Sequence, residues 1–297
     1  MRTKLCIAAN EQFGVPLNDQ AALIADAGFD AVFYGWSPAL HEHIRSARQA
    51  GLEVQSVHAP FGGCADLWLE DGEKGERALE ELLMCAADCA KHEVGLMVSH
   101  AFIGFDKPLK PDEKARLRGL TRYGKLVAQA ARLGVTVAFE NTEGDAYLDL
   151  LLRTFGEEKN VGFCLDTGHE MCYNGSRDLL AVYGQYLIAT HLNDNLGVKA
   201  KDGRITWHDD LHLLPFDGIA DWEQIARRLK KTGFTGPLTF ELNPRSKPNR
   251  HENDAYAAMP IEQYLAAAYM RACKVRALFE KACTPGKAHT EKKILPL

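Results

Sequence analysis

Residues 133–140 read LGVTVAFE, a glycine followed by an apolar, β-rich run that ends on a carboxylate. The residues before it, 111–133, have a helical pattern, so Gly134 stands where a left-handed residue is expected after a helix. Residues 135–140 have the length and the β-branched content of a buried strand. The stretch therefore predicts a helix, a glycine turn and a strand that ends in Glu140.

The same unit recurs along the chain in both directions. Gly28, Gly51 and Gly233 also stand between a helical pattern and a strand-like run. Further helical patterns cover residues 19–27, 73–92, 222–231 and 261–283. Together with residues 135–140, the expected strands cover residues 5–8, 31–34, 53–58, 95–100, 162–166, 188–192 and 238–242. Such alternation predicts parallel strands joined by crossover helices.

Eight units in 297 residues favour a single (β/α)8 barrel over an open sheet. An open dinucleotide-binding sheet usually has a GxGxxG loop after its first strand, whereas residues 8–16 read AANEQFGVP. We expect an α/β chain with one barrel domain at residues 1–283 and a C-terminal tail at residues 284–297. The active site of this fold lies at the C-terminal ends of the strands.

Composition limits the function classes. The net charge of −5 offers no general attraction to a polyanion and argues against nucleic acid as a partner. No apolar run reaches the roughly 18 to 20 residues that span a bilayer, and the N-terminus lacks a signal-peptide pattern, so we expect a cytoplasmic protein without a membrane partner. The eight cysteines lack metal-site or disulfide spacing and are interpreted as reduced, small hydrophobic residues.

Six consecutive expected strands end in a residue that can ligate a metal or move a proton. In chain order these residues are His58, His100, Glu140, Asp166, His191 and Glu241. His169 follows Asp166 by three residues, and Asp210 and His212 lie in the long insertion at residues 195–218. Because parallel barrel strands bring their C-terminal ends to one face, these side chains are expected to meet there. Burying so many ionisable groups without partners costs several kcal/mol each, and a cation removes most of that cost.

The types of ligand indicate which metal is expected. Glu140, Asp166, His191 and Glu241 offer three carboxylates and one imidazole, an oxygen-rich set that suits manganese, magnesium or cobalt and also accepts zinc. Further imidazoles favour zinc at additional sites. The candidates for additional metal ligands are His58, His100, His169, Asp210 and His212. We therefore expect at least one divalent metal ion, and manganese is the preferred candidate.

These segments, in this order, resemble the xylose-isomerase-like barrel superfamily, which includes sugar isomerases, ketose 3-epimerases and the endonuclease IV group. The resemblance runs from the His58 strand to the Glu241 strand, and DTGH at residues 166–169 with HLND at 191–194 is its most specific part. It implies that Glu140, Asp166, His191 and Glu241 are metal ligands and that His169 contacts substrate. It is also compatible with a homo-oligomer, whereas the sequence leaves the oligomeric state open.

The first function that the resemblance implies is a metal-dependent isomerase or epimerase of a sugar or sugar phosphate. Proton transfer would pass through a metal-stabilised enediolate, with Glu140 and Glu241 as catalytic carboxylates. His58, His100 and His169 are expected to contact the carbohydrate, Trp68 to pack on it, and Arg245 to hold an anionic group.

Three alternatives stay open. Endonuclease IV uses nine ligands for three zinc ions, and this chain has a candidate for each, which allows a phosphodiesterase acting on abasic DNA. The loop after His58, APFGGCADLW at residues 59–68, has no cation for phosphate contacts. A lyase or dehydratase acting on a polyol or glycoside would use the same metal and bases. A barrel that only binds carbohydrate is the third alternative.

Overall fold

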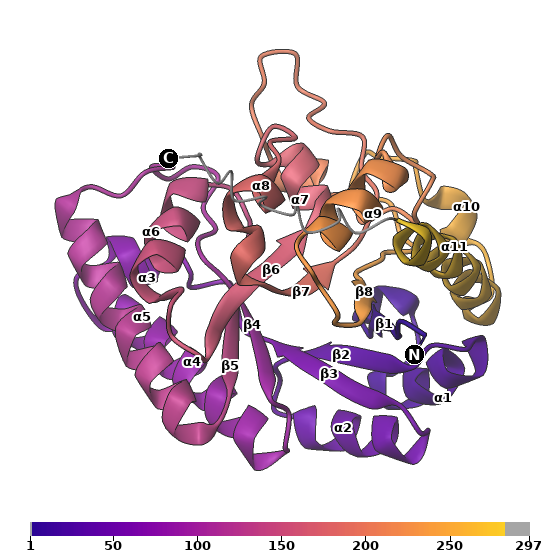
Figure 1. Ribbon diagram of the computed structural model, residues 1–297, viewed down its shortest axis with the longest axis horizontal. Helices are drawn as coiled ribbons and strands as arrows, with labels where there is room; N and C mark the ends of the chain where they lie inside the picture. Colours follow the sequence, from indigo (N-terminus) through magenta and orange to yellow (C-terminus); the bar gives the residue numbers. More distant parts are fainter. Residues whose placement is uncertain (1, 283–297) are drawn as a thin grey trace, which may run out of the picture.

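Eight parallel strands form one continuous sheet in the computed structural model, which describes residues 2–282 (Figure 1). Their order is β7-β6-β5-β4-β3-β2-β1-β8. The strands are β1 (Leu5–Ala8), β2 (Ala31–Gly35), β3 (Glu53–His58), β4 (Leu96–His100), β5 (Thr136–Glu140), β6 (Val161–Asp166), β7 (Leu187–His191) and β8 (Leu238–Phe240). Each expected strand is present, most with ends shifted by one or two residues.

The sheet closes between β7 and β8 through an irregular junction. The Leu192 amide donates to the Thr239 carbonyl at 2.7 Å, and the Glu241 amide donates to the Leu192 carbonyl at 3.2 Å. These bonds join the two ends of the strand order, so the architecture is a single (β/α)8 barrel, as the alternating pattern predicts.

Helices surround the barrel on its outer side (Figure 1). The main helices are α1 (Leu17–Ala27), α2 (Leu40–Gln49), α4 (Glu73–Lys91), α5 (Glu113–Leu133), α6 (Asp145–Phe155), α9 (Trp222–Lys231) and α11 (Ile261–Lys281). Shorter helices are α3 (Asp66–Leu69), α7 (Thr167–Cys172), α8 (Leu179–Tyr183) and α10 (Asp254–Ala257). The expected tail at residues 284–297 lies outside the described residues. No helix within residues 2–282 is long and apolar enough to cross a membrane.

Glycine ends several of these helices as the sequence predicts. Gly28, Gly51, Gly134 and Gly233 have φ angles of 107°, 79°, 71° and 81°, the left-handed region that a side chain disfavours. At Gly134 the amide donates back to the carbonyl groups of Ala130 and Ala131, which satisfies the end of α5. The described cysteines are all free, and all of them except Cys273 are buried.

The two-residue alternation of the strands positions the polar strand ends. Val98, Ala138, Cys164 and Ala189 form a small-residue cluster across four adjacent strands. Two residues further along these strands stand His100, Glu140, Asp166 and His191. Because side chains two apart on a strand share a face, the four polar side chains lie on the same face as this cluster, one layer nearer the C-terminal end.

Candidate metal centre

Glu140 lies at the centre of the polar cluster and is completely buried. Its Oε2 atom is 3.2 Å from His58 Nε2 and 3.5 Å from His100 Nε2, while its Oε1 atom is 3.0 Å from His191 Nδ1. Burial alone would raise the pKa of Glu140, but His191, His100 and His58 outweigh it and hold the pKa well below its usual value. The carboxylate is therefore ionised and shared among three imidazoles.

The hydrogen bonds of His58 fix which of its nitrogen atoms carries the proton. Nδ1 is 2.8 Å from the Ala59 carbonyl, which only accepts, so Nδ1 is the donor. In the neutral ring, Nε2 then presents a lone pair at 3.2 Å from both Glu140 Oε2 and His100 Nε2. A cation between His58 Nε2 and Glu140 Oε2 would turn a contact between two acceptors into a pair of ligands.

Four residues gather their ligand atoms within 4.8 Å of one another: Glu140, Asp166, His191 and Glu241. His191 Nδ1 joins the two glutamates, at 3.0 Å from Glu140 Oε1 and 3.1 Å from Glu241 Oε2. Burial raises the pKa of Asp166 to about 6, because the nearby His169 offsets the cost of burial only in part. Three carboxylates and one imidazole at this spacing fit a divalent cation with a preference for oxygen ligands.

Two further groups of ligand atoms flank this one. His58, His100 and Glu140 form one, and His169, Asp210 and His212 form the other, each again within 4.8 Å. His169 Nδ1 donates to the Asn141 carbonyl at 2.8 Å and His212 Nδ1 to the Glu241 carbonyl at 3.1 Å. Their Nε2 atoms therefore face Asp210 Oδ2, at 3.6 Å and 2.8 Å. The structure thus brings together every residue that the sequence analysis names as a metal candidate.

One more group was missed by the sequence analysis, which treated its cysteine as a small hydrophobic residue. Cys164 lies with Glu140 and His191 in a set of candidate ligand atoms. Burial raises the pKa of the Cys164 thiol well above its usual value in the metal-free protein. Because the thiolate is the metal-binding form, Cys164 is a weak candidate beside the carboxylates.

Asp194 holds the insertion that delivers Asp210 and His212. Its buried carboxylate accepts hydrogen bonds from the amides of Phe216 and Ala220 at 2.9 and 3.0 Å and from the Trp222 indole at 2.8 Å. Its backbone pairs with Leu213 in an antiparallel bridge. The insertion is thereby tied to the end of β7, and its candidate ligands Asp210 and His212 lie with His169.

A cavity of about 670 Å³ opens above the polar cluster. Of the residues expected to bind substrate, His58, His100 and His169 line it, as does Glu241, whose side chain is 27% exposed. Glu140 does not line it. Aromatic side chains make up much of the wall, among them Trp36, Phe61, Phe105, Tyr173 and Trp207. The cavity therefore combines a charged floor with apolar sides, as ligand pockets commonly do.

The structure places two expected substrate contacts elsewhere. Trp68 is fully buried in α3, which packs on α4 and α5, and its indole donates to the Ala101 carbonyl at 2.8 Å. Arg245 is exposed outside the cavity, and its Nε atom donates to the Gln12 carbonyl at 3.0 Å. Both assignments are corrected: the Trp68 indole completes the core, and Arg245 ties two loops together.

Phe61, Tyr173 and Lys247 are among the cavity residues that sequence reasoning missed. Tyr173 stacks on His169 with ring centroids 5.0 Å apart, and Phe61 lies 5.1 Å from the His100 ring. Tyr173 follows His169 by four residues at the end of α7, a helical spacing that could have revealed it. Lys247 also lines the cavity, and its position six residues after Glu241 gave no sequence signal.

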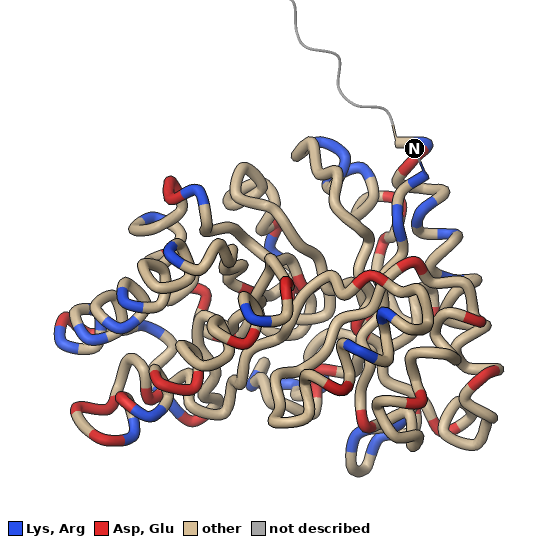
Figure 2. Tube along the Cα trace, turned by 90° about the horizontal axis from the view of Figure 1, so that it is seen from below, with Lys and Arg blue, Asp and Glu red and all other residues tan. Residues whose placement is uncertain are grey.

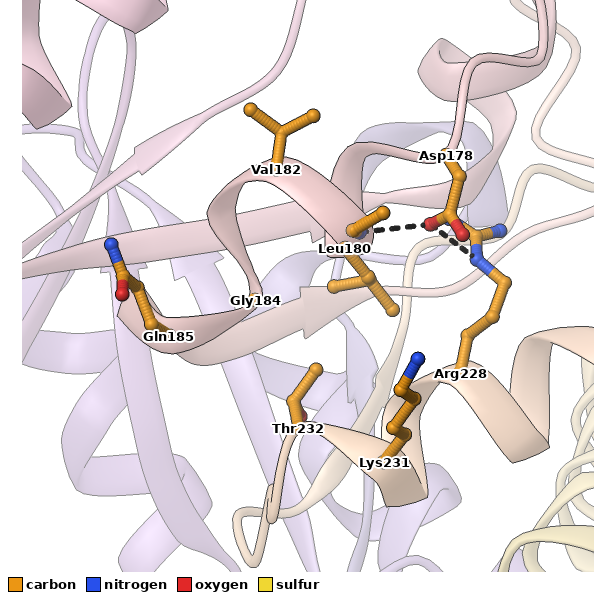
Figure 3. Close-up of a pocket in the computed structure, with 9 residues that line it drawn as sticks. Asp178, Leu180, Val182, Gly184, Gln185, Arg228, Lys231 and Thr232 are labelled. Atoms are coloured by element: carbon orange, nitrogen blue, oxygen red, sulfur yellow. Dashed lines mark hydrogen bonds and ion pairs between the residues drawn. The ribbon is translucent and has the colours of Figure 1, made fainter. Parts of the chain in front are cut away.

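A second cavity, of about 460 Å³, lies between α8 and α9 (Figure 3). Arg228 lines this cavity. Its guanidinium group donates to Asp178 at 2.8 Å and pairs with both carboxylate oxygens of the buried Glu170. With its charge already matched by two carboxylates, Arg228 offers little to an anionic ligand. This cavity adds no candidate site.

Gly168 is expected to tolerate no side chain. A Cβ there would stand 1.9 Å from Asn193 Oδ1, and the Asn193 amide also donates to Asp166 Oδ2 at 2.9 Å. We expect Gly168→Ala to destabilise the fold by about 1 to 3 kcal/mol, the usual cost of overpacking, and to weaken metal binding by shifting Asn193. Chemical denaturation and metal titration measure both effects. Gly95→Ala is the control, because a Cβ at Gly95 has no neighbour within 4 Å; equal stability of the two variants would contradict this account.

The metal-free protein is expected to lose stability as the pH rises from 7 to 8.5. Burial alone would lower the pKa of His212, but Asp210 outweighs it and raises the pKa to about 9. A group with a raised folded-state pKa contributes stability that is complete below its unfolded pKa and lost as the pH rises toward the folded value. Over this window His212 accounts for about 1 to 2 kcal/mol. Thermal denaturation in EDTA tests this, and an unchanged pH slope in His212→Asn would contradict it.

The comparisons with known proteins agree with this fold. The family model for the xylose isomerase-like TIM barrel matches residues 21–260. The chain is 34% identical over 161 residues to the uncharacterized protein y4fM of Sinorhizobium fredii, covering 50% of this chain and 48% of that protein. It is 29% identical over 178 residues to the rhizopine catabolism protein MocC of Rhizobium meliloti, covering 54% and 53%. The chain thus spans about half the length of the curated relatives it matches.

A solved structure extends the likeness over the whole barrel. The D-psicose 3-epimerase of Clostridium cellulolyticum H10, determined with D-tagatose, superposes with a TM-score of 0.71 at 17% identity, covering 94% of this chain and 100% of that one. At this identity the likeness shows the fold alone. The family model carries the assignment, because it matches well over half of the residues: the chain belongs to the xylose isomerase-like TIM barrel family.

Proposed function

We propose that the protein is a metal-dependent isomerase or epimerase of a sugar or sugar derivative. The observation that carries the proposal is the convergence of Glu140, Asp166, His191 and Glu241, of which Glu241 lines the aromatic-walled cavity. A divalent ion is held by these four side chains in the proposal, with manganese first and zinc, cobalt or magnesium as alternatives. We also propose a cytoplasmic location, as expected from the sequence, which leaves the oligomeric state open.

The bound ion would supply positive charge that stabilises a developing enediolate. Glu241 is placed to move the proton, because its side chain is partly exposed to the cavity while it lies 3.1 Å from His191 Nδ1. Glu140 is the second catalytic carboxylate of the proposal; because it does not line the cavity in the metal-free protein, it would act chiefly as a ligand of the ion. His169, held by the Asn141 carbonyl, would orient a substrate oxygen with His58 and His100.

The relatives support a carbohydrate substrate. The structurally similar D-psicose 3-epimerase acts on a ketose by name, and MocC takes part in rhizopine catabolism by name. A lyase or dehydratase acting on a polyol or glycoside would use the same ion and carboxylates. It would differ in releasing water or an alcohol after proton abstraction, so product analysis separates the two reactions.

Proton exchange tests the proposed function directly. Manganese-loaded protein is incubated with a panel of ketoses, ketose phosphates and keto-polyols in deuterated water and followed by proton NMR. The expected result is deuterium incorporation beside the carbonyl of at least one compound, with an isomer, epimer or dehydrated product. Absence of exchange across the panel, with the metal bound, would overturn the proposal.

A phosphodiesterase is the second candidate, favoured by one observation. Without the Cys164 group, three groups of candidate ligand atoms remain, two of them sharing Glu140, and three such groups are what three zinc ions would need. The charge distribution argues against DNA, since Lys and Arg are interspersed with Asp and Glu along the trace (Figure 2) and Lys247 is the one Lys or Arg among the residues that line the described cavity. Zinc-loaded protein that nicks abasic duplex DNA at low salt would support this candidate, and absence of nicking would remove it.

A further inference from the structure

Lys247 stands out in the cavity because its positive charge has no close partner. Its side chain is 19% exposed, and its nearest carboxylate atom is Asp210 Oδ2, at 4.0 Å. Asp210 Oδ2 already lies 2.8 Å from His212 Nε2 and 3.6 Å from His169 Nε2. At 4.0 Å the ion pair of Lys247 with Asp210 is too long for a hydrogen bond. A mostly buried ammonium group in this state retains most of its capacity to bind an anion.

Two arginines outside the cavity already have carboxylate partners. Arg250 donates to Glu252 at 2.6 Å and lies 3.8 Å from Asp209, and Arg228 pairs with Glu170 and Asp178. Lys247 instead lies over the Trp207 ring, 5.3 Å from its centroid. This contact stabilises the cation but leaves its N–H groups for a ligand. Trp207 is 46% exposed, so a bound ring could also cover it.

We propose that Lys247 recognises an anionic group, a carboxylate or a phosphate, on the carbohydrate substrate. This inference rests on the proposed function and narrows the substrate class to sugar acids and sugar phosphates. Lys247 would act as a specificity residue: it holds the charged end of the substrate beside Trp207 while the carbonyl end reaches Glu241. Lys247 lies next to Asp210, so it would hold the anion at the side of the cavity that the Asn195–Gly218 insertion forms.

Calorimetry on the manganese-loaded protein tests the proposal with three probes: D-fructose, D-fructose 6-phosphate and D-fructuronate. We expect at least one anionic probe to bind about 10- to 100-fold more tightly than D-fructose, as a charge-assisted contact provides. Lys247→Met should abolish that advantage without changing the affinity for D-fructose, and Lys247→Arg should retain part of it. Arg245→Met is the matched control and should leave all affinities unchanged, because Arg245 lies outside the cavity.

The two anionic probes distinguish phosphate from carboxylate recognition. An anion bound only by the metal would keep its advantage in Lys247→Met, and that result would overturn the proposal. Equal affinity for neutral and anionic probes, or no binding of any probe, would overturn it as well. Proton exchange on D-fructose without tighter binding of an anionic probe would refute the role of Lys247 but leave the proposed isomerase standing. Lys247-dependent binding of an anionic probe without exchange on any ketose would support the role of Lys247 but contradict the proposed isomerase.

Discussion

Glu140→Gln is expected to lower the affinity for the first divalent metal by at least about 100-fold, since changes even in the groups that orient ligands cost about 10- to 100-fold. Glu140 contacts His58, His100 and His191 and belongs to three of the four groups of candidate ligand atoms described above. The amide of glutamine keeps the size of the side chain but removes the charge and places an N–H group against an imidazole. Isothermal titration with manganese, and the rise in melting temperature that it produces, measure the loss.

Glu11→Gln is the matched control for this variant. Glu11 also lines the cavity but is exposed and belongs to none of the groups of candidate ligands. The control removes the same charge from the same cavity, so it reports the general electrostatic effect on a cation. If Glu140→Gln binds manganese as tightly as Glu11→Gln does, Glu140 is not a ligand.

Glu241→Gln is expected to reduce proton exchange about 100- to 10,000-fold at saturating manganese, the range typical of a lost general base. Burial alone would raise the pKa of Glu241, but His191 outweighs it and lowers the pKa to about 2 in the metal-free protein, so the carboxylate is ionised. Glutamine cannot accept a proton but retains a carbonyl oxygen toward the ion. The backbone carbonyl that receives His212 is unchanged.

The measurement is the rate of deuterium incorporation on the best ketose, with metal content determined on the same sample. A variant that keeps its ion but loses exchange supports a role in proton transfer, while loss of both indicates only a ligand. Exchange at the wild-type rate would contradict the proposed base. Glu11→Gln again serves as the control, with unchanged exchange expected.

The strand ends could be predicted from the sequence because a strand has a two-residue period and barrel strands are parallel. Given those two facts, Val98 and His100, or Ala138 and Glu140, must share a face, and all C-terminal ends must meet. The glycine at position 134 was equally predictable, since its conformation is a local requirement of the helix end. Family resemblance then supplied expected roles for Glu140, Asp166, His191 and Glu241.

The remaining parts of the cavity depend on contacts that sequence spacing does not encode. Trp68 was expected to contact the substrate because it follows the strand that ends in His58. The packing of α3 against α4 and α5 instead buries the Trp68 side chain in the core. Arg245 and Lys247 are two residues apart in an irregular segment, and only the three-dimensional structure shows that Lys247 lines the cavity. The route of the Asn195–Gly218 insertion likewise depends on the bonds of Asp194.

Metal analysis of protein purified without added metal tests the central claim most directly. Elemental analysis gives the number and identity of the ions per chain, and anomalous diffraction from crystals of the same preparation locates them. The account predicts at least one divalent ion bound by Glu140, Asp166, His191 and Glu241. Two further ions at His58 with His100 and at His169 with Asp210 and His212 would shift the reaction toward the phosphodiesterase. Folded protein that holds no ion at the four residues, even after dialysis against manganese, would contradict the account.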